Sequence, residues 1–348
     1  MKVQTSVPRR VIALRDKDDM SLLHSASGGA FMVLAREVIA QGGIVYGCAL
    51  EDGRIARHEG AQNIAELRRL QGSKYVQGDT GDTFSDCARQ LKSGRLVLYT
   101  GTPCQIAGLK RFLAVGESKL SLDNLLTCDL VCHGTTSPRL FSLYLTWLQQ
   151  KIRADSPIND YIFRSKHYGW ALNYSYSYSR KGKTHAVYGE ANDDPYYAAF
   201  LSGQHYRKCC YECHFASANR PGDFTIGDYW GIEHQHPAFN DPRGVSVLLM
   251  NTEKAETFFN SSCMDKCEWI ESTYEQAAAE NMNLQHPSVR TALGKKLAVQ
   301  VDEALRSEDA ELIFAHLLKQ KITIGKIAKK ILPLPIVTFI RKLRGKRQ

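Results

Sequence analysis

Two short cysteine motifs have a spacing that is typical of metal binding. In Cys210-Tyr-Glu-Cys213, two thiolates can bind one metal ion or cluster from a single turn. Cys128 and Cys132 of the CDLVCHG segment could complete a zinc site with this pair, and Cys104 of GTPCQ is a further candidate. The cysteines therefore predict a metal site whose ligands come from distant parts of the chain.

The expected secondary structure favours Cys104 over Cys128. Cys104 follows the expected strand 96–99 through a Gly-Thr-Pro turn and stands at a helix start, where the helix dipole favours a thiolate. Cys132 stands at the exit of the expected strand 125–131, whereas Cys128 falls inside it. Since successive parallel strands end at one edge, Cys104 and Cys132 can both face the Cys210 and Cys213 loop. The alternative for these two residues is ordinary burial. Four other cysteines are expected to serve packing or the surface: Cys48, Cys87, Cys263 and Cys267.

The elements that must position these residues alternate between helix and strand. Apolar spacing predicts a helix and a strand between Gly28 and Cys48. A polar helix near 82–92, the strand 96–99, another helix and the strand 125–131 follow. This alternation predicts an α/β fold with a mainly parallel sheet, whose functional turns lie at the C-terminal ends of the strands.

The pattern changes beyond residue 155. Residues 173–179 alternate with period two and a turn at 180–183 leads into 184–188, which predicts a half-exposed β-hairpin. The stretch 208–233 is rich in cysteine, glycine and aromatic residues, and 245–251 has the pattern of a buried strand. Helices are expected in the remainder, including a helical C-terminal tail.

Composition and charge narrow the class of protein. A hydrophobic content of 43% in 348 residues is sufficient for a core of ordinary size. The net charge of +9 arises from the C-terminal segment, because no acidic residue follows Glu311 while ten basic residues stand between Lys319 and Arg347. The rest of the chain is near neutral, which argues against a nucleic-acid surface spread over the fold.

Both ends of the chain predict a cytoplasmic protein. The first residues carry positive charge without an apolar run, so no signal or anchor is expected there. The apolar stretch 331–340 is far shorter than the roughly 20 residues of a membrane span. The basic and aliphatic segment from Lys319 to Arg347 suits reversible contact with the inner membrane face or with an acidic partner, and a solvated helix is the alternative.

Seven segments, taken together and in order, resemble the coenzyme F420 hydrogenase/dehydrogenase beta-subunit family over roughly residues 10–265. They are Ser25–Ala30, Gly72–Gln77, Gly101–Leu109, Asp129–Gly134, Phe163–Lys166 with Gly169-Trp170, Cys210–Cys213 and Gly227–Gly231. The resemblance implies an N-terminal region over 8–88 and a C-terminal domain with the iron-sulfur site over 92–265. A helical basic tail over 270–348 would follow.

The resemblance implies an iron-sulfur flavoprotein oxidoreductase with FAD and a [4Fe-4S] cluster. The implied cluster ligands are Cys104, Cys132, Cys210 and Cys213, and coenzyme F420 or another hydride carrier would be the substrate. Many relatives begin with a ferredoxin-like segment that has two C-x-x-C-x-x-C-x-x-x-C runs, whereas this chain has no cysteine before Cys48. We therefore expect the electron partner to be a separate ferredoxin-like, dehydrogenase or hydrogenase protein.

Several polar and glycine residues within these segments could bind the flavin. The expected cofactor-binding residues are Ser27, Gly28, Gly29, Ser73, Lys74, Tyr75, Thr102 and Asp228. Backbone N–H groups in the glycine segment could bind the pyrophosphate at a helix start, and the alternative is an N-cap serine with closely packed glycines. Lys74 could neutralise a phosphate or the reduced flavin, and the alternative is a solvated surface lysine. For Asp228 the alternative is a tight structural turn.

Lys74 and His133 are the expected catalytic residues, because a lysine can stabilise negative charge and a histidine can donate a proton. The alternative for His133 is a structural histidine. Arg164 and Lys166 could bind an anionic substrate, or could be exposed basic residues without a specific role. The alternative function is a four-cysteine metal-binding accessory or scaffold protein that works alongside surface-polysaccharide enzymes.

Overall fold

The computed structural model describes residues 7–116, 120–158, 160–203, 205–290, 292–311 and 314. Its strands are β1 Arg10–Asp16, β2 Ile44–Glu51, β3 Ile55–Ala61, β4 Val97–Gly101, β5 Leu125–Leu130, β6 Ile162–Phe163, β7 Asn173–Arg180, β8 Lys183–Glu190, β9 Phe224–Asp228, β10 Ser246–Met250 and β11 Cys267–Ser272. The predicted basic segment from 319 to 347 and the first six residues lie outside the described residues.

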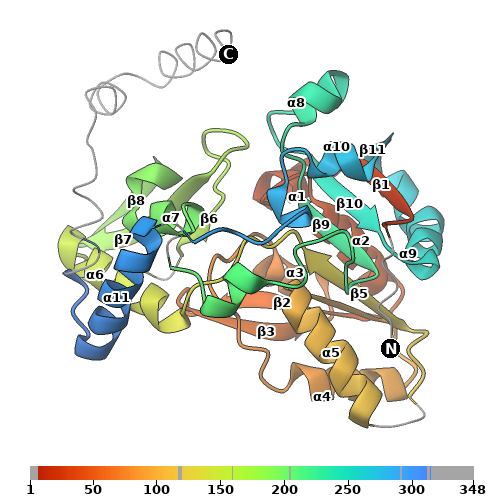
Figure 1. Ribbon diagram of the computed structural model, residues 1–348, viewed down its shortest axis with the longest axis horizontal. Coiled ribbons are helices and arrows are strands. Elements are labelled where there is room, and N and C mark those ends of the chain that lie inside the picture. Colours follow the sequence, from red (N-terminus) through yellow and green to blue (C-terminus); the bar gives the residue numbers. More distant parts are fainter. Residues whose placement is uncertain are drawn as a thin grey trace.

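Helices alternate with many of these strands, as Figure 1 shows. The α-helices are α1 Asp19–His24, α2 Ala30–Ala40, α3 Ile64–Leu70, α4 Thr83–Lys92, α5 Pro103–Gly116, α6 Pro138–Ile152, α7 Pro195–Leu201, α8 Ile232–Gln235, α9 Glu253–Phe258, α10 Tyr274–Ala278 and α11 Ala292–Ser307. Short helical turns are η1 Ala191–Asp193, η2 Lys208–Glu212, η3 Pro237–Phe239, η4 Phe259–Cys263, η5 Met264–Lys266 and η6 Met282–Leu284.

In the described part of the chain, eight strands form one sheet in the order β11-β1-β10-β9-β5-β4-β2-β3. The central neighbours β9, β5, β4 and β2 are parallel, and the remaining strands join them antiparallel. The predicted α/β class with a mainly parallel sheet is confirmed, since β1, β9, β5, β4 and β2 run in one direction. Strands from both sides of the expected boundary at 88–92 share this sheet, and the division into domains stays a prediction.

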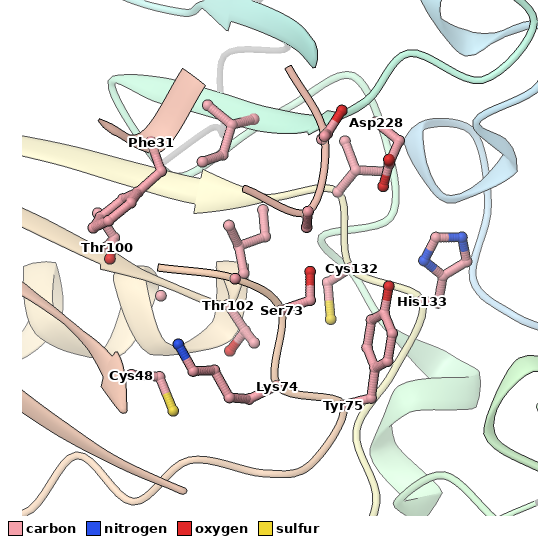
Figure 2. A pocket seen from close by; sticks show the side chains of 18 of the residues that line it. Phe31, Cys48, Ser73, Lys74, Tyr75, Thr100, Thr102, Cys132, His133 and Asp228 are labelled. Atoms are coloured by element: carbon pink, nitrogen blue, oxygen red, sulfur yellow. The ribbon is translucent and has the colours of Figure 1, made fainter. Parts of the chain in front are cut away.

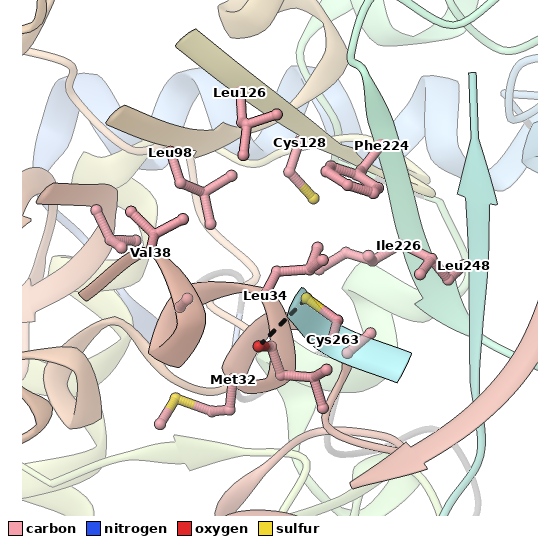
Figure 3. Close-up of a cluster of buried hydrophobic side chains, with 14 of the residues drawn as sticks. Met32, Leu34, Val38, Leu98, Leu126, Cys128, Phe224, Ile226, Leu248 and Cys263 are labelled. Atoms are coloured by element: carbon pink, nitrogen blue, oxygen red, sulfur yellow. Dashed lines mark hydrogen bonds between the residues drawn. The ribbon is translucent and has the colours of Figure 1, made fainter. Parts of the chain in front are cut away.

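Strand side chains alternate between the two faces of the large sheet, as a period of two requires. Ile12 and Leu14 of β1 lie in the core cluster that α2 covers, whereas Val11 and Ala13 lie in a cluster on the other face. Figure 3 shows the first cluster, in which Leu34 of α2 packs among strand side chains. Since each fully buried side chain of this size contributes roughly 1.5–3 kcal/mol, the two clusters fix the position of the strands whose ends carry the site.

A smaller sheet in the order β6-β7-β8 packs with α6, α7 and α11 around an aromatic core. The predicted hairpin is confirmed as β7 and β8. Its turn places both Lys181 and Gly182 at positive φ, as tight two-residue hairpins require. Tyr174 and Tyr176 of β7 stack on Tyr161 with ring centroids 5.9 and 6.0 Å apart. Among the described helices, none combines the length and the hydrophobicity of a membrane span.

Candidate functional site

A cavity of about 230 Å³ lies where β4, β5 and β9 end, and Figure 2 shows the side chains around it. Loops after these strands, the segment before α2 and residues 70–78 after α3 form its walls. The sequence-predicted residues that line it are Ser27, Gly29, Ser73, Lys74, Tyr75, Thr102, Cys132, His133 and Asp228. Gly28 does not line it. The structure thus brings together residues from five separate segments at the C-terminal edge of the parallel strands, where α/β proteins bind ligands.

Gly28 and Gly29 have different structural roles. A Cβ on Gly28 would lie 2.3 Å from the carbonyl oxygen of Leu14 and from the backbone nitrogen of Ser246, so close packing between β1 and β10 requires glycine. Gly29 caps α2 with a φ of 87°. Ser27 is not the N-cap that the alternative interpretation required, because its hydroxyl donates to the Val245 carbonyl at 2.7 Å. The glycine segment therefore combines close packing with a helix start that borders the cavity.

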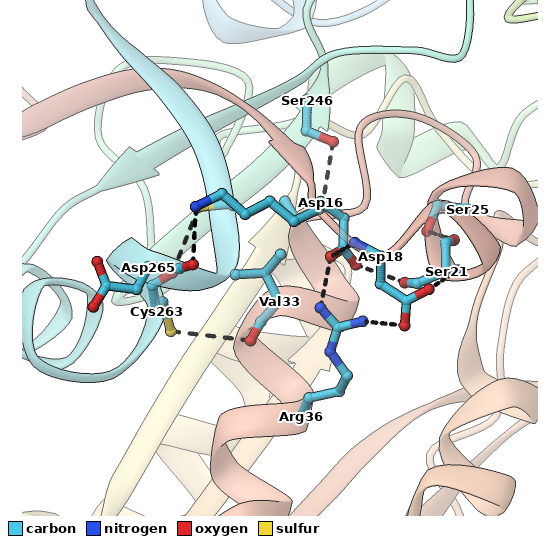
Figure 4. Close-up of polar contacts among 12 residues, drawn as sticks. Asp16, Asp18, Ser21, Ser25, Val33, Arg36, Ser246, Cys263 and Asp265 are labelled. Carbon is cyan, nitrogen blue, oxygen red and sulfur yellow. Dashed lines mark hydrogen bonds and ion pairs between the residues drawn. The ribbon is translucent and has the colours of Figure 1, made fainter.

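A buried carboxylate lies at the end of β1, beside this segment, and Figure 4 shows its contacts with Arg36 and Ser21. The Asp16 side chain accepts hydrogen bonds from Arg36 Nη2 and from the Ser21 hydroxyl, both at 2.6 Å. The backbone N–H of Asp16 donates to the Gly28 carbonyl at 2.7 Å. The paired and fully buried carboxylate thus holds α1 and α2 at the end of β1, and the backbone bond to Gly28 holds the glycine segment there.

Lys74 is half-buried, so the interpretation as a solvated surface lysine is wrong. Its ammonium donates to the carbonyls of Arg69, Leu70 and Gln71 at 3.2, 2.9 and 2.8 Å. These contacts satisfy the carbonyls at the C-terminal end of α3 and use all three donors of the ammonium. Burial lowers the pKa of Lys74 to about 8. The lysine thus places a positive charge at the cavity wall without a free N–H group.

Asp228 forms a bidentate ion pair with Arg164, with both N–O distances at 2.6 Å. The Trp170 indole N–H also donates to Asp228, at 2.7 Å. Of the two interpretations of Arg164, the one as an exposed residue is wrong, because its side chain is only 1% exposed. Its remaining donors reach the Tyr75 hydroxyl at 3.2 Å and the carbonyls of Ala26 and Ala171 at 3.0 and 3.3 Å. All five guanidinium N–H groups thus have protein acceptors, which leaves none for a substrate.

Lys166 is also enclosed rather than exposed. Its ammonium donates to the carbonyls of Leu22 and Ser27 at 2.5 and 2.7 Å. Burial, and then the positive charge of Arg164, lower the pKa of Lys166 to about 7. Arg164 and Lys166 together fasten the segment before α2 to the smaller sheet.

The aromatic ring of Tyr75 separates the cavity from the aromatic core. It stacks on Phe200 with centroids 4.5 Å apart. Figure 2 shows the Tyr75 hydroxyl beside Cys132 and His133. The His133 side chain is exposed at the cavity wall, and its backbone carbonyl accepts a hydrogen bond from Ser288 at 2.7 Å.

Two further cavity residues, His58 and Cys48, were not predicted as site residues. His58 is buried, its Nε2 lies 3.2 Å from the Thr100 carbonyl, and burial lowers its pKa to about 4. Burial raises the pKa of Cys48, and the positive charge of Lys74 opposes this effect. A Cβ on Gly78 would lie 2.9 Å from the Cys48 sulfur and 3.3 Å from His58 Nδ1. No local pattern marks these residues, because β2 and β3 meet the GSKY segment only in the folded chain.

Of the four predicted cysteine ligands, Cys132 lines the cavity, and the other three are near enough to influence its thiol electrostatically. Burial, and then the neighbouring thiols of Cys104, Cys210 and Cys213, raise the pKa of Cys132 to about 12. Cys104 is exposed at the first turn of α5, and its sulfur lies 3.2 Å from the Thr102 hydroxyl. Cys128 is different, since it lies inside β5 with its side chain in the hydrophobic core.

The same thiols do not form a compact ion site. Among the described residues, no three His, Cys, Asp or Glu side chains stand close enough to hold a metal ion. All ten cysteines are free of disulfides. Four free thiols are still a donor set whose chemistry suits a metal group, and they come from three segments of the chain.

Comparisons with known proteins found one matching family and solved structures with a similar fold. The family model for the C terminus of the coenzyme F420 hydrogenase/dehydrogenase beta subunit matches residues 94–275, just over half of the chain. No curated protein matches the chain. A solved structure of the F420-reducing [NiFe] hydrogenase complex from Methanosarcina barkeri, derivatised with xenon, contains a chain with a similar fold. The TM-score is 0.51 at 14% identity, over 86% of this chain and 92% of that chain.

Proposed function

The chain belongs to the coenzyme F420 hydrogenase/dehydrogenase beta-subunit family, and on this premise we propose that it is an iron-sulfur flavoprotein oxidoreductase. One observation carries the proposal: Cys132 lines the same cavity as most of the expected flavin-binding residues, and the other three thiols are near enough to influence it electrostatically. A flavin and a cluster bound at these places would be neighbours. Such neighbours can exchange electrons directly, which links two-electron hydride chemistry to one-electron transfer.

We propose that Cys104, Cys132, Cys210 and Cys213 hold a [4Fe-4S] cluster. The chemistry that the cluster supplies is one-electron transfer. The chain contributes four thiolates and two nearby hydroxyl groups. Thr102 lies 3.2 Å from the Cys104 sulfur and Thr135 lies 3.9 Å from the Cys210 sulfur. Hydrogen bonds to cluster sulfurs tune the reduction potential, so these threonines would influence the electron affinity of the site.

FAD is the proposed second cofactor, and it supplies hydride exchange when bound. Apolar side chains and a few polar groups line the cavity, which is typical of cofactor sites. The helix start after Gly29 can bind the pyrophosphate through backbone N–H groups. Lys74 would stabilise negative charge on the flavin ring through its own charge, because its N–H groups are already bound. His133 would hold or donate a proton at the cavity wall.

The proposed substrate is coenzyme F420 or another hydride carrier. A separate ferredoxin-like, dehydrogenase or hydrogenase protein would exchange electrons with the cluster, and the exposure of Cys104 supports an approach from that side. We further propose a cytoplasmic location. The basic segment from Lys319 to Arg347 would give salt-sensitive contact with the inner membrane face.

The decisive experiment is cofactor analysis of protein purified without oxygen. We expect about four irons and four sulfides per chain, because a thiolate-bound cubane has that composition. One FAD per chain is expected with them. The Cys104, Cys132, Cys210 and Cys213 to serine variants should each lose iron, whereas Cys128→Ser should retain it.

Two results would contradict this function. Stoichiometric zinc with neither iron nor flavin would favour the four-cysteine scaffold protein instead. Iron that persists when all four proposed ligands are serine would place the metal elsewhere. With iron and flavin both bound, reduction assays with deazaflavin and nicotinamide donors would identify the hydride carrier.

A further inference from the structure

A buried arginine–aspartate pair contacts the segment before Cys132 and the segment after Cys213. Asp129 stands near the end of β5, three residues before Cys132, and Arg220 stands seven residues after Cys213. Their side chains are 0% and 1% exposed, and Arg220 Nη2 lies 2.6 Å from Asp129 Oδ1. Arg220 falls outside all seven segments that carry the family resemblance. The pair is therefore a feature that only the folded chain reveals.

The Arg220 guanidinium joins the cysteine loop to the end of β5. Nη1 donates to the Phe215 carbonyl at 2.6 Å, two residues beyond Cys213. Nη2 donates to the Leu130 carbonyl at 2.7 Å, two residues before Cys132. One rigid, planar group thus contacts both segments that lead to proposed ligands, and a lysine ammonium could not reproduce its fork of donors.

The second oxygen of Asp129 completes the connection. Asp129 Oδ2 accepts the backbone N–H of Gly222 at 2.8 Å. A Cβ on Gly222 would lie 2.8 Å from the Asp129 backbone nitrogen and 2.5 Å from the Phe224 carbonyl oxygen, so only glycine permits this approach. The turn that returns the chain from the cysteine loop to β9 is therefore fixed to the same carboxylate.

We propose that Asp129 and Arg220 are positioning residues for the cluster: they hold the Cys210 and Cys213 loop at a set distance from Cys132. This inference rests on the proposed function for the identity of the bound group, but not for the contacts themselves. A buried ion pair contributes little net stability compared with apolar packing, so the geometry that this pair imposes on the loop explains it better than stability does. Residues behind metal ligands typically change metal affinity by about 10–100-fold when they are replaced.

A neighbouring network provides a matched control. Asp223 accepts hydrogen bonds from the Thr127 backbone N–H at 2.8 Å and from its hydroxyl at 2.7 Å, which joins the residue before β9 to the middle of β5. Thr127 is as buried as Asp129 and stands two residues before it on the same strand. The hydrogen bonds of the Asp223 and Thr127 side chains do not reach the cysteine loop in the described chain. Thr127→Val therefore removes the hydrogen bond that the hydroxyl donates, and the one that the Asp223 N–H donates to the hydroxyl at 3.0 Å, while Arg220 and Asp129 keep all their partner atoms.

The experiment compares Arg220→Gln, Arg220→Lys and Thr127→Val with the unchanged full-length protein. The first readout is iron per chain, and its loss over time under a chelator, with flavin per chain measured on the same samples. Arg220→Gln should lose iron at least about 10-fold faster while it retains flavin. Arg220→Lys keeps the positive charge but loses the planar set of N–H donors. Its rate of iron loss should therefore lie between those of Arg220→Gln and the unchanged protein. Thr127→Val should retain iron.

The second readout is hydrogen exchange of the loop 208–219 in cluster-free protein. Exchange should accelerate in Arg220→Gln and stay unchanged in Thr127→Val. Unchanged iron retention in both Arg220 variants, or equal losses in Thr127→Val, would overturn the positioning role. If the unchanged protein binds no iron, the proposed function fails, and the exchange measurement alone then decides: faster exchange in Arg220→Gln supports the positioning role and unchanged exchange overturns it.

Discussion

Two buried arginine–aspartate pairs stand at the ends of neighbouring parallel strands and hold different parts of the molecule together. Asp129 belongs to β5 and pairs with Arg220, whereas Asp228 ends β9 and pairs with Arg164. Both arginine side chains are 1% exposed. The difference lies in what else the two guanidinium groups contact.

The contacts of Arg220 stay within the cysteine loop and the two strands beside it. Arg164 reaches further, because it joins the smaller sheet to the segment before α2, to Tyr75 and to the end of β9. One pair thus holds the proposed cluster ligands and the other holds the walls of the cavity. A buried arginine–aspartate pair thus stands at each of two neighbouring sites. Replacing one pair should therefore reduce mainly the cofactor bound at its own site.

Arg164→Gln should have the largest effect on stability. It leaves the Asp228 carboxylate, which is 15% exposed, without its counter-charge. Breaking a buried pair in this way typically costs about 3–5 kcal/mol. We expect the free energy of unfolding to fall by this amount in urea titrations, and the bound flavin to decrease more than the bound iron.

The double variant Arg164→Gln with Asp228→Asn is the control for this effect. It removes the unpaired charge and leaves two amides that can hydrogen-bond to each other. The double variant should therefore be more stable than Arg164→Gln alone, which gives a favourable coupling in a double-mutant cycle. A loss below about 1 kcal/mol in the single variant would show that the pair behaves like an exposed one.

Acid should destabilise both the cavity and the segment before the cysteine loop, because each contains a buried neutral histidine. Burial lowers the pKa of His58, at the cavity, and of His205, just before the cysteine loop, to about 4. The unfolded chain, with a pKa of about 6.5, then binds protons first as the pH falls. The stabilising contribution is complete above pH ~6.5 and decreases as the pH falls towards 4, by roughly 3 kcal/mol for each histidine.

His205→Phe separates the two histidines. Neither ring nitrogen of His205 has a hydrogen-bond partner within the described chain, so phenylalanine should cost little at neutral pH. Urea unfolding at pH 7 and near pH 4.5 should show a smaller pH dependence in this variant than in the unchanged protein. An unchanged dependence would mean that the acid effect arises from other groups.

The sequence predicted the parallel centre of the fold better than its edges. Strands such as β4 and β5 were marked by apolar runs with a glycine turn or a polar helix beside them. The edge strand β3 alternates polar and small residues, and its role becomes evident only from its pairing with β2. β11 lies in a segment that was expected to be helical, and it is a strand because β1 offers a free edge for pairing. Long-range pairing decided these elements, and local periodicity does not encode it.

The candidate site shows the same limit. Lys74 and Asp228 line the cavity, and their predicted role in flavin binding stays a prediction. Their contacts were not predictable, because the carbonyls of α3 and the guanidinium of Arg164 come from other segments. Arg220 was missed because an isolated arginine carries no motif. Its role depends on a carbonyl and a carboxylate that only the folded chain places together.

Gly222→Ala would disturb the cysteine-side pair sterically while it keeps both charges. The added Cβ would lie 3.0 Å from Asp129 Oδ2 and closer still to backbone atoms, so the turn must shift. Overpacking of this kind typically costs about 1–3 kcal/mol. We expect lower iron retention with little change in flavin content. Gly108→Ala in α5 is the control, since its Cβ would meet Phe84 at an ordinary 3.6 Å and alanine favours a helix. Equal losses in the two variants would contradict a specific role for the turn.

The smallest effect is expected for an exposed pair of the same chemical type. Arg139 Nη2 lies 2.8 Å from Glu308 Oε1, a distance close to that in the buried pairs, but the two side chains are 60% and 74% exposed. Water and salt screen such a pair, and its contribution is typically about 0–1 kcal/mol. Arg139→Gln should therefore change the urea midpoint little, and iron and flavin contents should stay the same. The N–O distance is nearly the same in the three arginine–carboxylate pairs, whereas their burial differs. A large loss of stability in Arg139→Gln would therefore show that burial does not explain the different effects of the three arginine substitutions.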